Sequence, residues 1–531
     1  YIEKMTDREE IYLGALLHDI GKFAFRAKKT ERDMDHELLG SLLIQNELSR
    51  AFPAIAQNSQ KIISLATRSN DEIKNADRLA AGERKGELSK ETRRPLISIF
   101  QKIDIKESDS QKKQIPSGIY YHKPEPLTME RQKLEYEQDI SLANWQPDED
   151  NMIQNHRSSY TQFLDELETI GKEGNIDDSR AMLTTLYSLM WKYTSNVSSA
   201  SYQSTPDISL FDHSRITAAL AICKHDDKDN LILLGADISG IQHFIYEEII
   251  ETKQASKRLR GRSFFVKLLS ETIANYIIRE LDLYEGNILY NNGGTFEIFI
   301  PNTVKNIEKL EELEKKINLF LFRKFDLKLQ VIIDWKEEKQ SDIIQNYQAI
   351  QQALRFRMRQ KKRQKSYSIL EDIFDEKEVK KGDKKILFEN IGKSIPHTKY
   401  LIEVIIKNEF TNESRFERVD FEEFGTYWYF VYDEKGFREI LGDLNNKSIE
   451  RVIIYDLEST DIGKLANLTT NRDYPIGLSF KFIANYAPLS KEDRFQIAEF
   501  KEIAAKGASN YPLLGVFRAD VDNLGFLISK G

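Results

Sequence analysis

Residues 231–250 read LILLGADISGIQHFIYEEII and residues 287–301 read NILYNNGGTFEIFIP, and the rest of the chain is arranged around them. The first stretch opens with a short, continuous apolar run, which is typical of a buried strand. The second has two strand-like runs joined by Asn-Asn-Gly-Gly, which predicts a β-hairpin. Helical patterns over 255–281 and 304–322, followed by an alternating run over 327–335, complete a β-α-β-β-α-β order.

This order predicts a ferredoxin-like domain, the arrangement of nucleotidyl-cyclase and polymerase palms. In those palms, acids at the end of the first strand and on the hairpin hold two divalent cations on a triphosphate. Asp237 ends the first strand, but the hairpin tip carries no acid, and the nearest one, Glu297, lies inside the next strand. Ser239 and Gly240 could hold an anion where the helix begins. We therefore expect this palm to bind a nucleotide and to be poor at two-metal chemistry.

The last part of the chain has the pattern of a second palm. Residues 513–525, LLGVFRADVDNLG, form an apolar strand that runs into acids, then a turn and a helix start. Asp520 and Asp522 lie two residues apart on the expected strand, so their side chains point to the same side, as metal ligands must. The hairpin that would complete this palm is not among these residues. We therefore expect only the start of a second palm.

The N-terminal segment predicts a metal site on helices. Residues 6–22, TDREEIYLGALLHDIGK, combine an N-cap, early acids and an apolar stripe that leads to His18 and Asp19. An imidazole and a carboxylate placed side by side can bind one metal ion. His36 and Asp77 follow on later helical segments. The order of these residues resembles the ligand order of HD-superfamily phosphohydrolases, so we expect His18, Asp19, His36 and Asp77 to be the ligands.

One feature of the HD pattern is missing. HD domains usually offer a further histidine between the second and the last ligand, and residues 63–70 contain none. Three explanations stay open: another residue is a ligand, the site binds metal weakly, or the site is inactive. His213, in an amphipathic helical stretch at 207–223, is interpreted as a packed or capping residue rather than a ligand.

Composition limits the class of protein. The chain has 531 residues, which is too long for one core and predicts about three or four domains. Its single cysteine, Cys223, excludes a disulfide scaffold and a cysteine-based zinc site. No apolar run has membrane-spanning length and no signal peptide is present, which predicts a cytoplasmic protein without a membrane partner. The net charge of −8 argues against a protein that coats nucleic acid over its whole surface.

Basic residues gather in two places and could neutralise phosphates locally. One cluster lies on the expected helix of the palm, and the other, RFRMRQKKRQK, covers residues 355–365. Solvated helix faces are an equally good explanation for each cluster. The candidates for contact with phosphate in the first cluster are Lys253, Arg258, Arg260 and Arg262.

The expected architecture is an α+β multidomain chain, in which an all-helical HD domain precedes ferredoxin-like palm domains. The expected boundaries are 1–120 for the HD domain, 121–230 for a helical connector, 231–365 for the first palm, 366–510 for a small mixed inter-palm domain and 511–531 for the start of the second palm.

Several fragments together resemble the signature large subunit of type III-A (Csm-type) CRISPR effector complexes. They are LLHDIGK at 16–22, ADRLAAGER at 76–84, KPEPLTM at 123–129, DISLFDHSRITAALA at 207–221, DISGIQHFIY at 237–246, NNGGTFEIFIPN at 291–302 and FRADVDNLG at 517–525.

This resemblance implies a subunit that binds crRNA and target RNA with other Csm-complex proteins, cleaves single-stranded DNA at the HD domain, and makes cyclic oligoadenylates from ATP at paired palms. It implies Mg²⁺ or Mn²⁺ at the palms and a Mn²⁺, Ni²⁺ or Co²⁺ type of ion at the HD site. By match, the ATP-phosphate turn is Asp237, Ser239 and Gly240, with Gly293 and Gly294 as its floor. Catalysis is assigned to His18, Asp19, Asp520 and Asp522, and Asp520 would also begin the metal site of the second palm.

Two other functions fit parts of the pattern. A stand-alone GGDEF-like cyclase fused to an HD phosphohydrolase would need no RNA. A scaffold subunit with vestigial sites would explain both the missing histidine and the neutral hairpin. Family members usually carry a pair of Cys-x-x-Cys motifs between the palms, and this chain has none, so the sequence proposes no zinc there.

Overall fold

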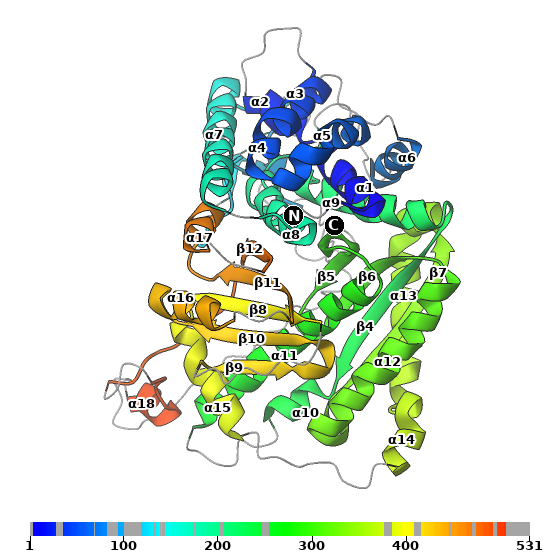
Figure 1. Cartoon of the computed structure of the whole chain (residues 1–531), viewed down its shortest axis with the longest axis vertical. Coiled ribbons are helices and arrows are strands. Elements are labelled where there is room, and N and C mark those ends of the chain that lie inside the picture. Colours follow the sequence, from blue (N-terminus) through cyan, green and yellow to red (C-terminus); the bar gives the residue numbers. More distant parts are fainter. Residues whose placement is uncertain are drawn as a thin grey trace, which may run out of the picture.

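The structure is a computed structural model that describes residues 4–27, 35–67, 70–81, 94–99, 118–130, 134–138, 140, 144–174, 176–200, 205–246, 254–375, 385–407, 416–444, 448–469, 474–491 and 496–505. Helices of the N-terminal half form one end of the molecule (Figure 1). The palm and a second sheet domain lie side by side at the other end. This arrangement confirms the expected fold class.

The N-terminal helices begin where the sequence supplies caps. Thr6 and Glu9 form a capping box at the start of α1, and Asp148, Asp178 and Ser209 cap later helices through their side chains. The helices are α1 (Asp7–Leu17), α2 (Gly21–Ala27), α3 (His36–Leu43), α4 (Ser49–Ala51), α5 (Pro53–Ala66), α6 (Asp71–Ala81), α7 (Glu149–Glu173), α8 (Ser179–Thr194) and α9 (Leu210–Asp226).

A small antiparallel sheet interrupts this helical part. It has the order β1-β2-β3 and consists of β1 (Leu96–Ile97), β2 (Gly118–His122) and β3 (Glu135–Gln138). Ile119 and Trp145 are fully buried beneath it. The sequence analysis divided this region at residue 120 between the HD domain and the connector, whereas strand β2 crosses that boundary.

The palm has the predicted ferredoxin-like topology. Its elements are β4 (Asn230–Ser239), α10 (Ile241–Tyr246), α11 (Ala255–Glu280), β5 (Ile288–Asn291), β6 (Thr295–Pro301), α12 (Val304–Phe325) and β7 (Gln330–Lys339). The sheet order is β5-β6-β4-β7, and every neighbouring pair is antiparallel. In the register of the sheet, Asp237 on β4 lies opposite Thr295 on β6, beside the hairpin.

A basic helix lies on the palm sheet. Helix α13 (Gln340–Lys361) contacts the sheet where Gly235 leaves room, since a Cβ there would meet Met358 and Leu354. Two short 3-10 turns and α14 (Leu370–Asp375) follow α13.

The residues from 385 to 505, which we call the inter-palm domain, contain a mixed sheet. Its elements are α15 (Lys385–Ser394), β8 (Tyr400–Ile406), β9 (Arg418–Phe421), β10 (Thr426–Val431), α16 (Glu434–Asp443), β11 (Ile449–Asp456), α17 (Ile462–Leu468), β12 (Ile476–Phe480) and α18 (Phe500–Ala505). The sheet order is β12-β11-β8-β10-β9, with β11 and β12 parallel. Trp428 is fully buried and donates a hydrogen bond to Thr272 of α11 at 2.9 Å, which joins this domain to the palm.

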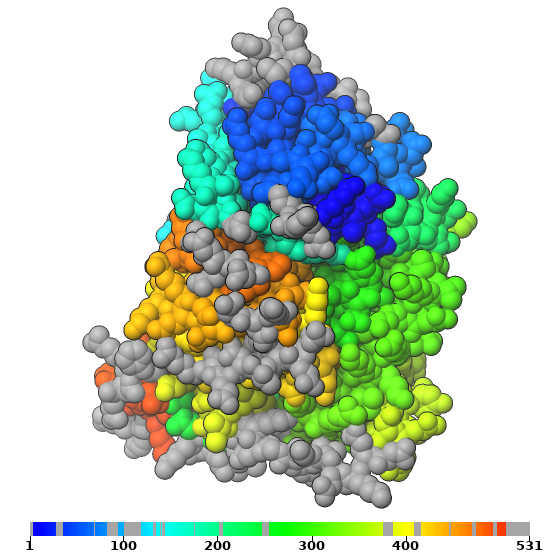
Figure 2. All heavy atoms as spheres, in the orientation of Figure 1, coloured from blue at the N-terminus to red at the C-terminus, as the bar shows by residue number. Residues whose placement is uncertain are grey.

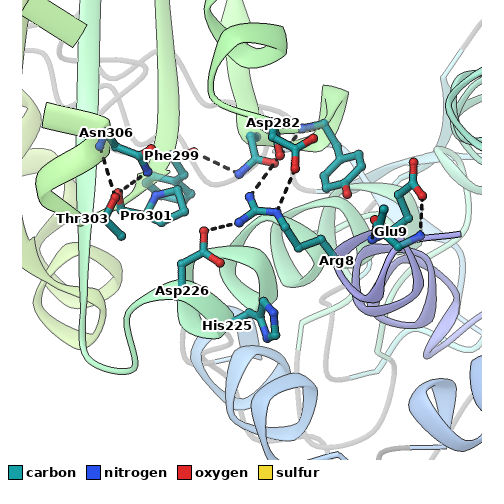
Figure 3. Close-up of polar contacts among 12 residues, drawn as sticks. Arg8, Glu9, His225, Asp226, Asp282, Phe299, Pro301, Thr303 and Asn306 are labelled. Carbon is teal, nitrogen blue, oxygen red and sulfur yellow. Dashed lines mark hydrogen bonds and ion pairs between the residues drawn. The ribbon is translucent and has the colours of Figure 1, made fainter. Parts of the chain in front are cut away.

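The helical end is docked directly on the palm. Arg8 of α1 pairs with Asp226 of α9 and also donates to the backbone carbonyl of Asp282 at 3.0 Å (Figure 3). Tyr12 stacks on Tyr284 with ring centres 4.2 Å apart. The space-filling view shows the blue N-terminal helices resting on the green palm (Figure 2). A single buried core therefore extends from α1 to β12.

None of the described helices combines the length and the apolar character that a membrane span would require.

Candidate functional site

Four side chains from distant parts of the chain meet in the helical end. His18 follows the last residue of α1, Asp19 is next to it, Asp77 lies on α6 and His213 lies on α9. One ligand atom from each residue lies within 4.8 Å of the others, and all four residues are buried. Two imidazoles and two carboxylates are a donor set that suits a divalent transition metal. We call this set the HD cluster.

The separations inside the HD cluster fit one tetrahedral ion. The two imidazole Nε2 atoms are 3.3 Å apart, and the distances from these nitrogens to Asp19 Oδ2 and Asp77 Oδ1 range from 3.0 to 3.5 Å. Ligands about 2.0–2.1 Å from a tetrahedral ion are about 3.3–3.4 Å from one another. The residues present therefore fit a metal ion.

The backbone prepares His18 to bind metal through Nε2. Its Nδ1 lies 2.7 Å from the carbonyl oxygen of Ala15, and a carbonyl oxygen only accepts, so Nδ1 carries the proton. Burial alone would lower the pKa of His18, but the carboxylates of Asp19 and Asp77 outweigh it and raise the pKa to about 9. Burial likewise opposes ionisation of Asp19, yet His18 and Lys22 hold its pKa well below the usual range.

Lys22 supplies a positive charge at the edge of the HD cluster. Its ammonium group pairs with Asp19 Oδ2, one of the candidate ligand atoms, and donates to the carbonyl oxygen of Ser199 at 3.1 Å. The segment from His18 to Lys22 reads HDIGK, so Lys22 lies three residues, about one helical turn, after Asp19.

Replacing Lys22 with glutamine is expected to tighten Mn²⁺ binding by about tenfold, which corresponds to about 1.4 kcal/mol. The reason is that the ammonium group neutralises Asp19 and repels a cation. Competition against a fluorescent chelator measures the affinity, and Lys305→Gln, on the exposed side of α12, is the matched control. Equal or weaker binding by Lys22→Gln would contradict a competing role for this lysine.

Two sequence predictions about the HD cluster were wrong. His36 is not part of it, because His36 begins α3 and its backbone carbonyl packs against Gly21, where a Cβ would approach to 1.7 Å. His213, interpreted as a packed or capping residue, is buried in the cluster, with Nε2 3.0 Å from Asp77 Oδ1. A signal was available, since His213 is a histidine on an apolar helical stripe in a chain whose HD pattern lacked one.

A second candidate site is a cavity of about 380 Å³ on the palm, which we call the palm cavity. Asp237 lies at its wall, and Lys362, just beyond α13, places its ammonium group 2.6 Å from Asp237 Oδ2. Arg355 and Arg359 of α13 also line it. The ammonium group of Lys362 thus lies beside Asp237, the acid that the sequence analysis placed at the end of the first palm strand.

Glu297, the other acid of the palm cavity, is saturated with hydrogen bonds. Tyr290 donates to it at 2.7 Å, Tyr347 donates to its other oxygen, and Gln351 donates to both oxygens at 2.9 and 3.0 Å. Burial, and then the charge of Glu297, raise the pKa of both tyrosines, so their hydroxyls stay protonated donors. Both acids of the palm cavity thus have donors from the protein as partners.

The structure brings the predicted phosphate turn and hairpin together. The N–H of Ile238 donates to the carbonyl oxygen of Gly294 at 2.7 Å, so the hairpin lies against the end of β4. Ser239 is the last residue of β4 and Gly240 has a φ of 95°. A Cβ at Gly240 would lie 2.0 Å from the carbonyl oxygen of Lys328, so packing already requires a glycine there. Of these turn and hairpin residues, Asp237 alone lines the palm cavity.

The arginines predicted to meet phosphate on α11 are used for packing. Arg258 is buried, with Nε 3.3 Å from Glu389 of α15. Arg262 is buried and donates to the carbonyl oxygen of Phe244 at 2.8 Å, while Arg260 donates to backbone carbonyls at residues 485 and 486. Lys253, Asp520 and Asp522 lie outside the described residues.

Family models match the two regions of the chain that contain these candidate sites. The family model described as an HD domain matches residues 2–104, and the one described as Csm1 subunit domain B matches residues 230–378. A relative from Methanocaldococcus jannaschii is 30% identical over 60% of this chain and 44% of its own length. Another, from Enterococcus italicus, is 26% identical over 99% of this chain and 72% of its own length. Both are named CRISPR system single-strand-specific deoxyribonuclease Cas10/Csm1 (subtype III-A).

The chain is thus similar to Cas10/Csm1 proteins of subtype III-A.

Solved structures of the Cas10/Csm1 family share the fold. A Csm1-Csm4 cassette in complex with cA4 superposes with a TM-score of 0.64 and 20% identity, over 94% of this chain and 62% of the other. The Csm1-Csm4 subcomplex of a type III-A CRISPR-Csm interference complex gives a TM-score of 0.65 over 94% and 63%. The chain therefore spans 44% and 72% of the length of the two relatives, and 62% and 63% of the length of the two solved structures.

Proposed function

We propose that this chain acts as the large subunit of a type III-A CRISPR complex, with single-stranded DNA cleavage at the HD cluster and ATP binding at the palm. The observation that carries the proposal is the HD cluster itself, with nitrogen and oxygen donors at the separations of one tetrahedral site. A divalent ion held there would activate water and polarise a phosphodiester. The protein residues orient the donors and keep the site dry.

One observation disfavours the scaffold alternative. That alternative rested partly on the absence of a further histidine from the HD pattern, and His213 supplies a second imidazole to the HD cluster. The neutral hairpin is the remaining argument, and it concerns the palm alone.

For the palm, we propose that the phosphates of ATP lie against Arg355, Arg359 and Lys362. We also propose that metal-dependent synthesis of cyclic oligoadenylates needs a second palm, which begins at residue 511 and contains Asp520. Guanidinium and ammonium groups are the usual partners of phosphate, and both palm acids are occupied by protein donors. We also propose that the chain binds crRNA, target RNA and other Csm subunits, because it is similar to the Cas10/Csm1 relatives named above.

The proposal is tested with the purified chain and with the assembled complex. The chain should cleave single-stranded DNA in Mn²⁺ and leave double-stranded DNA intact. In the complex that contains the complete large subunit, target RNA should trigger conversion of ATP to cyclic oligoadenylates, and Asp520→Ala should abolish the product without disturbing assembly. Turnover of ATP that ignores target RNA would favour a stand-alone cyclase.

Replacing Lys362 with glutamine is expected to weaken ATP binding by about tenfold in the presence of EDTA. The change removes a cation from the palm cavity and leaves the Asp237 carboxylate to repel phosphate. Calorimetric titration measures the affinity, and Lys435→Gln, on the exposed face of α16, is the control. An unchanged affinity would place the phosphates elsewhere.

A further inference from the structure

A larger cavity, of about 580 Å³, lies where three parts of the chain meet. Its walls come from α8 of the helical end, α11 of the palm and the β11–β12 edge of the inter-palm sheet (Figure 1). We call it the junction cavity. It shares no lining residue with the HD cluster or the palm cavity. Its volume lies within the range of about 300–1,000 Å³ that is common for small-molecule sites.

The walls of the junction cavity are held in place by direct bonds. The Ser188 hydroxyl of α8 donates to the Ser479 hydroxyl of β12 at 2.8 Å, and the backbone N–H of Leu478 donates to the Thr185 hydroxyl at 3.0 Å. The cavity is therefore formed by the fold itself, so a ligand would not need to create it.

One end of the junction cavity is an aromatic platform. Trp191 stacks on Phe480 with ring centres 4.7 Å apart and planes within 8°. Phe482 stands perpendicular to Trp191, with ring centres 5.6 Å apart, and 45% of its surface is exposed. An exposed ring beside a stacked pair offers a face to another planar ring, such as a nucleobase.

The other walls of the junction cavity carry five cationic side chains and four acidic ones. Arg451 lines it, and among the described residues the buried Nε of this arginine has no hydrogen-bond partner. Lys481 lies 2.9 Å from Glu271, and Lys267 pairs with the same carboxylate, so two ammonium groups share one acid. Burial opposes ionisation of Glu271, but the two lysines lower its pKa and keep it charged.

The remaining acids of the cavity wall are Asp282, Glu285 and Glu450, and two of them pair with side chains of the same wall. Thr184 donates to Glu285, and Arg180 pairs with Asp282. The junction cavity thus combines an aromatic face with an arginine able to bind an anion, which is the chemistry of a base joined to a phosphate.

We propose that the junction cavity binds a nucleoside phosphate, with the base against Phe482 and Trp191 and the phosphate at Arg451. This site is separate from the nucleotide site proposed for the palm. It touches the helical end, the palm and the inter-palm sheet at once, so an occupant connects all three.

The test uses AMP and adenosine as probes, titrated calorimetrically into the full chain in EDTA. Phe482→Ala is expected to weaken both probes by at least about tenfold, because both lose the stacking contact. Arg451→Gln is expected to weaken AMP by about tenfold and to leave adenosine within about twofold, because adenosine has no phosphate. Lys362→Gln, at the palm cavity, should not change binding at this site, which separates the two proposals.

Controls cover folding and surface effects. Phe356→Ala removes an aromatic ring on α13 that is 62% exposed, and Arg438→Gln removes an exposed arginine on α16; both should bind AMP like the unmodified chain. Thermal unfolding checks that each variant is folded. No AMP binding by the unmodified chain, or equal AMP affinity in Phe482→Ala and Arg451→Gln and the unmodified chain, would overturn the proposal. A short single-stranded DNA that displaces AMP would identify the occupant as the end of a strand, and no displacement would identify a free nucleotide.

Discussion

Replacing His213 with alanine is expected to reduce Mn²⁺-dependent cleavage of single-stranded DNA by at least about a hundredfold. Loss of a residue that only supports a metal ligand costs about 10–100-fold, and His213 offers its own Nε2 to the HD cluster, 3.3 Å from that of His18. The remaining imidazole and two carboxylates would hold the ion more weakly. Cleavage rates on labelled DNA and metal content per chain measure the two effects.

The matched control is His36→Ala. The sequence predicted His36 as a ligand, whereas the structure leaves it out of the HD cluster, so this variant should keep its cleavage rate and metal content within about twofold. A His36→Ala chain that loses its metal, beside a His213→Ala chain that keeps it, would refute the cluster as the structure draws it.

Replacing Gly392 with valine is expected to give the largest loss of stability. Helices α11 and α15 cross at glycines, and a Cβ at Gly392 would lie 2.0 Å from the carbonyl oxygen of Lys257, while one at Gly261 would lie 1.8 Å from that of Phe388. Backbone atoms cannot yield as a flexible side chain can, so α15 must move away from α11. We expect a loss of about 3–5 kcal/mol, seen as a lower Tm and faster proteolysis near α15.

Gly442→Ala in α16 is the control for that variant. A Cβ at Gly442 would meet no atom within 4 Å, so the added methyl group costs no packing. Alanine also favours a helix interior over glycine by about 1 kcal/mol, so the Tm should stay the same or rise. If the Gly392→Val chain has the same Tm as the Gly442→Ala chain, then α11 and α15 can move apart without loss of stability.

The palm could be predicted from sequence because its signals are local. A hairpin of the Asn-Gly type, an apolar strand and two helical periods are each readable within about twenty residues. The position of Asp237 beside the hairpin was therefore predictable. Lys362 as its partner was not, because 125 residues separate the two in the chain.

The metal cluster shows the opposite limit. His18 and Asp19 are neighbours and carry a recognisable pattern, but His213 joins them across 195 residues through the packing of α9 on α1. His36 was predicted as a ligand because it follows His18 and Asp19 closely in the chain. The arginines of α11 fail for a related reason, since composition reveals charge but not that Arg258 and Arg262 are buried.

Helix α9 connects the HD cluster with the palm. His213 extends from the helix into the HD cluster, and two residues later Arg215 extends from it to grip the carbonyl oxygens of Ile288 and Leu289, at 3.1 and 2.9 Å, on the strand that leads to the palm hairpin. Helix α9 therefore contacts both the HD cluster and the strand that precedes the palm hairpin. A movement of the hairpin strand that tilted α9 would therefore also shift the His213 imidazole in the HD cluster.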